Sequence, residues 1–155
     1  EIGVRLVGSE MCIRDRNMSG AKMSFTILKN ADLRRADLSH VTMVGAKLEG
    51  SKLAGANLSS AIMVSQSLID INLRGADLRG SDLERANLGG ADLRGANLKG
   101  AKLRDANVGG ALIDESQICH LTQALNIEFV RIYIMRTDTI IDYGEYCRRY
   151  LIREE

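Results

Sequence analysis

The 155-residue sequence has no proline, no tryptophan and no long apolar run. A membrane-spanning helix needs about 20 mostly apolar residues in succession, so none is predicted and no membrane partner is expected. The formal net charge is only +1. Nucleic-acid-binding domains usually carry a strongly basic face, and this balance falls well short of one. We therefore expect no nucleic-acid partner.

Cysteine is scarce as well, with three residues, Cys12, Cys119 and Cys147. An odd number at wide spacing argues against a disulfide framework and favours a reducing compartment, which makes the cytoplasm the expected location. Cys119, His120 and Cys147 match no usual zinc-ligand spacing, so buried free thiols are the preferred interpretation. No metal and no cofactor are predicted.

Motifs that carry enzyme chemistry are also missing. The sequence contains no G-x-x-x-x-G-K-[ST] loop, no H-E-x-x-H pair and no C-x-x-C pair. Its two histidines, His40 and His120, have no serine or aspartate partner at a diagnostic spacing. The sequence therefore predicts a protein that is not an enzyme and has no catalytic residues.

What the sequence does have is a five-residue repeat that runs from residue 21 to 115 without an insertion. Residues 76–80 (Ala-Asp-Leu-Arg-Gly) show the pattern, with an aliphatic centre, a small residue two places earlier and often glycine at the end. A period of five matches neither a helix nor a strand. The chain must therefore turn once per unit to bring each central residue back to a common interior, and glycine suits such turns.

These A-(D/N)-L-x-x units resemble the pentapeptide repeat family. The resemblance implies an all-β solenoid, a right-handed quadrilateral β-helix with four units per coil and about five coils over residues 17–115. Residues twenty apart should then stack, and Met23, Met43 and Met63 have this spacing. Gln66 and Ile71 stand where the family prefers a small residue. We expect a local distortion at 65–72 there, or a bond from Gln66 to turn backbone.

The first residues do not look native. Residues 1–16 resemble the translated read-through of a library adapter, so we expect a non-native or disordered leader and a chain that is a fragment. A targeting signal lost from the N-terminus stays open.

The repeat stops after residue 115, and residues 116–155 are expected to form a small, mainly helical cap of two short helices. Apolar residues from Ile118 to Ile132 recur at three- and four-residue steps, which predicts the first helix, although 127–135 fits a strand as well. The second is expected to begin at Thr139 or Asp142. A solenoid end needs covering, which favours a cap; the alternative, implied by the resemblance, is a homodimer interface in this segment.

Two surfaces are candidates for binding. When the units are stacked, cations gather along one edge, which fits a phosphate or an acidic partner; Asp77 and Asp92 beside it favour a merely solvated face. The cations of this edge are Arg74, Arg79, Arg94 and Lys99. Val44, Ile62 and Val64 are expected to point outward as an apolar patch, either as a docking site or under a terminal segment.

The predicted function is a non-catalytic scaffold for protein–protein interaction, with an unknown partner. The resemblance implies an alternative, because some relatives imitate DNA and modulate DNA gyrase. That mechanism needs a strongly acidic rod, whereas residues 21–115 carry thirteen Lys and Arg against eleven Asp and Glu. A third alternative is a repeat module of a longer protein.

Overall fold

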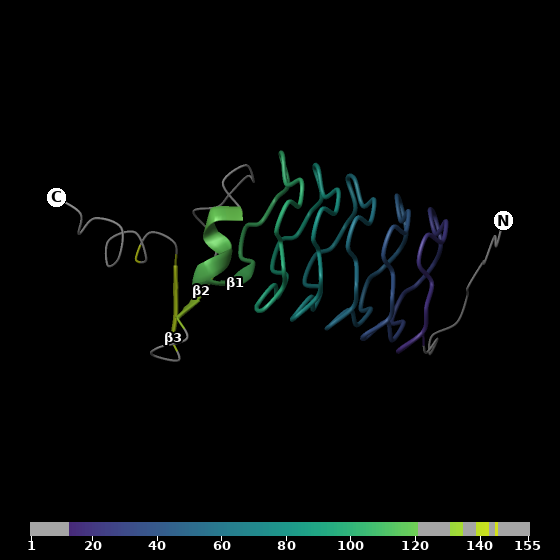
Figure 1. The fold of residues 1–155 in the computed structure, drawn as a ribbon. Helices are drawn as coiled ribbons and strands as arrows, with labels where there is room; N and C mark the ends of the chain where they lie inside the picture. Colours follow the sequence, from purple (N-terminus) through teal and green to yellow (C-terminus); the bar gives the residue numbers. More distant parts are fainter. Residues whose placement is uncertain (1–12, 121–130, 135–138, 143–144, 146–155) are drawn as a thin grey trace.

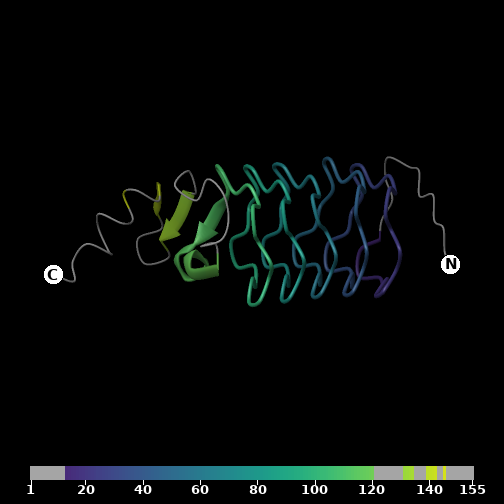
Figure 2. The same ribbon diagram turned by 90° about the horizontal axis from the view of Figure 1, so that it is seen from above.

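The computed structural model describes residues 13–120, 131–134, 139–142 and 145. Residues 13–114 form a rod of stacked coils, coloured from purple to green in Figure 1 and seen from above in Figure 2. Parallel backbone bridges join residues twenty positions apart, such as Asp37 with Asn57 and Asn57 with Asp77. Four five-residue units therefore complete one coil, which confirms the stacking expected from the sequence.

Each unit turns at the two residues that follow its centre. The N–H of Thr26 donates to the carbonyl of Met23 (3.2 Å), and the same bond recurs from unit to unit. The last residue of the unit has a positive φ, 59° at Phe25 and 71° at Gly45. A positive φ at the third residue of a turn defines type II, which explains the frequent glycine. Non-glycine residues hold the same conformation at Asp15, Phe25, Asn30, Arg35, His40, Ser60, Ser65, Asp70, Arg85 and Asp105.

The central residues fill the interior of the rod. Leu33, Leu73 and Leu93 are all 0% exposed, and Ala36 and Ala56, two places before a centre, are equally buried. Both positions point inward because alternate residues of an extended segment face the same side. Each buried aliphatic side chain stabilises the fold by roughly 1.5–3 kcal/mol. The buried side chains thus stabilise the rod from its interior.

Gln66 disturbs this regular stacking. Its side-chain amide donates to the carbonyls of Ala46 (2.5 Å) and Ser67 (3.3 Å). Bridges join Ile27 with Lys47 and Ser67 with Asn87, but among the described residues none joins Lys47 with Ser67. The amide therefore lies between two coils and takes the carbonyls that a bridge would use. Both expectations for this segment, a distortion and a bond to backbone, are confirmed.

The C-terminal end carries a three-stranded sheet. Its strands are β1 (Leu112–Asp114), β2 (Arg131–Ile134) and β3 (Thr139–Asp142), and the 3₁₀ helix η1 spans Glu115–His120. β1 pairs with β2 in parallel and β2 with β3 antiparallel. Because β1 also bridges back to Asp92, β2 lies on its other edge, away from the rod.

The expectation of a mainly helical end is wrong for residues 131–134 and 139–142, whereas η1 is helical. Residues 131–134 form a strand, the alternative that the sequence left open, and Thr139 begins β3 rather than a helix. Pairing with β1 explains the difference, since Ile132 lies opposite Ile113 and an exposed edge favours a strand over local helix propensity. Glu145 is helical, and its N–H donates to Asp142 (2.7 Å), the bond expected of a cap. The remaining residues of the two predicted helices lie outside the described ranges.

Gln117 fastens the start of η1 to the rod. Its side-chain oxygen accepts the N–H of Asp114 (2.7 Å), and its amide donates to the carbonyls of Leu93 (2.6 Å) and Ala96 (2.7 Å). The residue is only 3% exposed. In contrast to Gln66, it satisfies both ends of its amide.

At the other end, residues 13–16 belong to the rod, so the expectation that they lie in a disordered leader is wrong. Ile13 is 3% exposed, and its N–H donates to the carbonyl of Asp32 (2.8 Å). Arg14 forms an ion pair with Asp32 (2.7 Å). The pattern around Ile13 continues the five-residue repeat, which explains the placement; residues 1–12 lie outside the described ranges.

In the part of the chain that the structure describes, no helix has the length and apolar character needed to span a bilayer.

Candidate interaction surfaces

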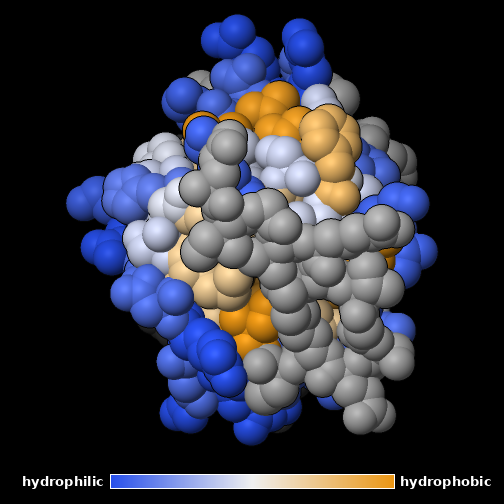
Figure 3. Space-filling model, turned by 90° about the vertical axis from the view of Figure 1, so that its right-hand side faces the viewer, coloured by the Kyte–Doolittle hydropathy of each residue, from blue (hydrophilic) through white to orange (hydrophobic). Residues whose placement is uncertain are grey.

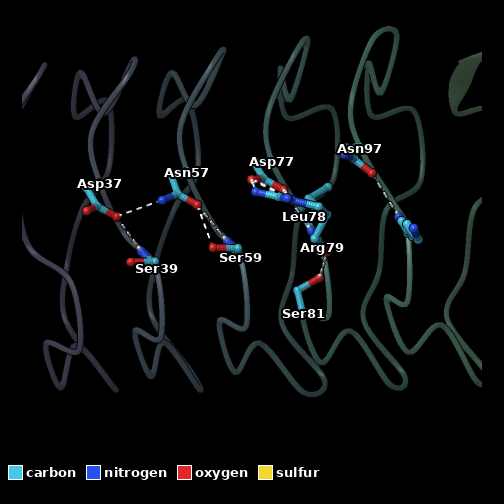
Figure 4. A network of polar contacts seen from close by, with 10 residues as sticks. Asp37, Ser39, Asn57, Ser59, Asp77, Leu78, Arg79, Ser81 and Asn97 are labelled. Atoms are coloured by element: carbon cyan, nitrogen blue, oxygen red, sulfur yellow. Dashed lines mark hydrogen bonds and ion pairs between the residues drawn. The ribbon is translucent and has the colours of Figure 1, made fainter.

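One face of the rod carries a polar ladder, shown in Figure 4. Its units are centred on residues 18, 38, 58, 78 and 98, and the residue before each centre is Asn or Asp. Each of these side chains accepts the N–H of the residue two places on, as Asp37 does from Ser39 (3.1 Å). Asn57 also donates to Asp37 (3.0 Å) in the neighbouring coil. The alternation of Asp and Asn therefore serves both the turns and the contacts between coils.

Three carboxylates of the rod have lowered pKa values. Hydrogen bonds from Ser39 hold the pKa of Asp37 below the usual 3.8, and a side-chain bond from Arg79 does the same for Asp77. Burial opposes ionisation of Asp92, but bonds from Arg94 outweigh it and its pKa also falls. A lowered folded-state pKa stabilises the fold above the unfolded pKa, and this contribution is lost as pH falls through the lowered value. The rod should therefore lose stability in acid.

Changing Asn57 to Asp tests the ladder. The substitution removes the donor to Asp37 and puts a carboxylate between Asp37 and Asp77, so we expect the free energy of unfolding to fall by about 1–3 kcal/mol at neutral pH. The loss should shrink near pH 4, where a protonated carboxyl donates again. Urea unfolding at both pH values measures it.

The matched control is Asn107→Asp. Asn107 donates to Asn87 in the same way (3.1 Å), but its neighbour in the column is an amide. If this variant lost as much stability as Asn57→Asp, repulsion between stacked carboxylates would not be the cause.

The predicted basic edge is present but partly neutralised. Arg79 pairs with Asp77 (2.6 Å) and Arg94 with Asp92 (2.6 Å), each within its own unit. Arg74 and Lys99 are exposed, and neither makes an ion pair with a described residue. Asp114 accepts the N–H of Gly95 at the end of this edge. The charge of Arg74 also helps to lower the pKa of Asp92, so the charge available to a ligand comes mainly from Lys99 and in part from Arg74.

The predicted apolar patch also faces outward. Ile62 is 43% exposed, and Val44 and Val64 are half-buried on the same face. Sequence reasoning missed Phe25 beside it, which is 79% exposed at a turn corner. Its ring covers Gly45, where an added Cβ would lie 2.8 Å from two ring carbons. A phenylalanine at the position that favours glycine was the available signal.

Figure 3 looks along the rod from the end that lies on the right in Figure 1. Hydrophilic side chains, in blue, dominate the outer sides, with hydrophobic areas between them.

Among the described residues, no group of three or more His, Cys, Asp and Glu side chains has a metal-binding arrangement. Cys12 and Cys147 lie outside the described ranges.

The model of the pentapeptide repeats matches residues 17–53 and 67–110 in eight copies, which is more than half of the chain. The chain therefore belongs to the pentapeptide repeat family. Members form right-handed quadrilateral β-helices and are generally non-catalytic structural or interaction proteins. The unmatched residues between the two ranges end at Gln66, beside which the backbone bridge between Lys47 and Ser67 is missing.

One solved structure supports the same fold. Rfr23, a pentapeptide repeat protein from the cyanobacterium Cyanothece 51142, is 27% identical over 70% of this chain and 82% of its own, with a TM-score of 0.56. A pentapeptide repeat protein of the Arabidopsis thaliana thylakoid lumen is 25% identical over 70% and 76%, with a TM-score of 0.30. QnrB1, a plasmid-mediated fluoroquinolone resistance protein, is 18% identical over 68% and 80%, with a TM-score of 0.26, which carries no functional argument. No curated protein matches the chain.

Proposed function

We propose that this protein is a non-catalytic scaffold that binds another protein through the outer faces of its rod. The observation that carries the proposal is the filled interior. Leu73 and Leu78 are 0% exposed, and the inner residues of their units, Ile71 and Ala76, are 3% and 1% exposed. Enzymes usually enclose their substrate in a cleft that excludes water. A rod packed with aliphatic side chains offers extended surfaces instead, which suit a protein partner.

The basic edge is the face that we assign to this partner. Arg74 and Lys99 lie on adjacent faces of the rod, one coil apart, with no described carboxylate paired to either. Arg79 and Arg94 between them already hold their own aspartates. Unpaired cations on a rigid frame attract a negatively charged segment without first breaking internal ion pairs. The partner expected here is an acidic stretch of protein.

Reversal of these two charges tests the proposal. We expect wild-type protein to bind a labelled peptide of alternating Glu and Ala, and Arg74→Glu with Lys99→Glu to weaken binding by about tenfold or more. Fluorescence anisotropy at low salt measures the affinity, and added salt should reduce it for the wild type.

A double variant of equal charge change, Lys47→Glu with Arg104→Glu, is the control, because both residues are exposed on other faces. It should keep most of the affinity. Absence of binding by wild-type protein, or an equal loss in both double variants, would remove the basic edge as the binding surface.

A further inference from the structure

A second face of the rod has a charge pattern that fits a copy of itself. This face, which we call the valine face, has its units centred on Met23, Met43, Met63, Leu83 and Leu103. Parallel bridges connect Lys22, Thr42, Ile62, Asp82 and Lys102 in that order along it. The second outward column, two residues later in each unit, is Ser24, Val44, Val64, Glu84 and Arg104. Along the rod the face is therefore basic, then apolar, then acidic, then basic again.

We propose that two copies of this chain pair through their valine faces, with the rods antiparallel. The two-fold axis lies across the rods, between the coils that contain Val44 and Val64. This operation leaves each column opposite itself and reverses the order of the coils. Val44 of one copy then meets Val64 of the other, Thr42 meets Ile62, and Lys22 meets Asp82.

The charges at the ends of the patch support this arrangement. Lys22 is exposed and Glu84 half-buried, and neither has an ion-pair partner among the described residues. Asp82 is already held by Lys102 (3.3 Å). Glu84 lies in the column next to Asp82, within reach of a lysine side chain from the opposing copy. The pairing thus gives both unpaired groups a partner of opposite charge, twice per dimer.

The column at the turn corner beside the valine face also offers a matching pair to a second copy. Phe25 and Arg85 lie in one column, three coils apart, and the antiparallel operation places each opposite the other. Both hold a positive φ, 59° and 56°, and Phe25 is 79% exposed. A guanidinium over an aromatic ring is attracted to its face. This contact gives a role to a phenylalanine whose backbone conformation favours glycine.

Parallel rods would not pair in this way. A two-fold axis along the rods brings each column opposite the other column of the same coil. Asp82 would then face Glu84, and Lys102 would face Arg104. In the parallel dimer, each of these like-charged contacts would form twice, once from each copy. Their repulsion opposes the parallel arrangement, so the charge pattern favours the antiparallel one.

The contact is small, which sets the strength of association. The four coils from Lys22 to Asp82 cover about 19 Å of rod at roughly 4.8 Å each. One face of this length buries less than the roughly 800 Å² per partner of a standard interface. We therefore expect a weak dimer that forms only at high protein concentration and weakens with salt.

Sedimentation equilibrium over a concentration series tests the pairing with the full chain. Lys22→Glu and Glu84→Lys should each weaken dimerisation by about tenfold or more. The double variant should associate more tightly than either single variant, because the exchanged charges restore an attractive pair between residues 22 and 84, although Asp82 stays acidic opposite residue 22. Thermal unfolding of each variant at low concentration shows whether it folds as the wild type does.

The outcomes separate this interface from others. A wild-type chain that stays monomeric throughout the series would overturn the proposal. So would a dimer that neither single substitution weakens, which is the result expected if the copies associate through residues 116–155. Failure of the double variant to associate more tightly than the single variants would contradict the antiparallel register.

Discussion

Replacing Gln66 by alanine is expected to raise the free energy of unfolding by about 1–3 kcal/mol, the cost of a buried polar atom without a partner. The side-chain oxygen of Gln66 is buried and has no hydrogen-bond partner among the described residues. Its amide also occupies the carbonyls of Ala46 and Ser67. Alanine already fills the equivalent inner position at Ala46 and Ala86, so the coils should close and the bridge between Lys47 and Ser67 should form. Urea unfolding measures the stability, and hydrogen exchange at Ser67 shows whether its N–H becomes protected.

Gln117→Ala is the matched control with the opposite expected sign. This glutamine is equally buried, but both ends of its amide are bonded. Its removal leaves the carbonyls of Leu93 and Ala96 without their donor, so stability should fall by about 1–3 kcal/mol. If both substitutions lowered stability by similar amounts, the amide of Gln66 would be a support of the rod and our interpretation of it would be wrong.

Replacing Leu73 by alanine is expected to lower the free energy of unfolding by about 2–5 kcal/mol, the usual range for a leucine lost from a packed core. Leu73 is 0% exposed and stacks between Leu53 and Leu93 in neighbouring coils. The narrow interior has little freedom to collapse around the cavity, because backbone bridges fix the distance between coils. Denaturant unfolding measures the change.

Ile69→Ala serves as the control for this substitution. Ile69 lies four residues before Leu73 but is 51% exposed, so its loss should change stability by no more than about 0.5 kcal/mol. A cost at Ile69 comparable to that at Leu73 would mean that the inward and outward positions of the unit have been assigned the wrong way round.

The repeat region was predictable because one physical constraint acts on every unit. A five-residue period returns Leu33, Leu53 and Leu73 to one interior only if the chain turns at each unit, and the structure has these turns. The recurring Asp and Asn were predictable for a similar reason. Their side chains satisfy a turn N–H, as Asp37 does for Ser39.

Features without a repeat were harder to foresee. Ile132 carries a helical pattern, yet it pairs with Ile113 because the last unit presents an open strand edge. The helical pattern of the local sequence gives no information about that strand edge, which exists only in the folded chain. The state of the basic edge, by contrast, can be read from the sequence. Arg79 and Arg94 each follow an aspartate by two residues and pair with it, whereas Arg74 follows Asn72, which offers no charge.

The ladder, the basic edge and the valine face all depend on one claim, that the coil contains four units and residues twenty apart are neighbours. Engineered cysteine pairs test it most directly, after the three native cysteines are replaced by serine. We expect Ser59→Cys with Arg79→Cys to form an intramolecular disulfide under mild oxidation, because stacked coils hold Cα atoms about 4.8 Å apart, within the range that a disulfide spans. Mass spectrometry of the oxidised chain measures the yield. Cross-linking of Ser59→Cys with Arg74→Cys, or with Glu84→Cys, in place of the first pair would indicate a coil of three or five units and contradict the account.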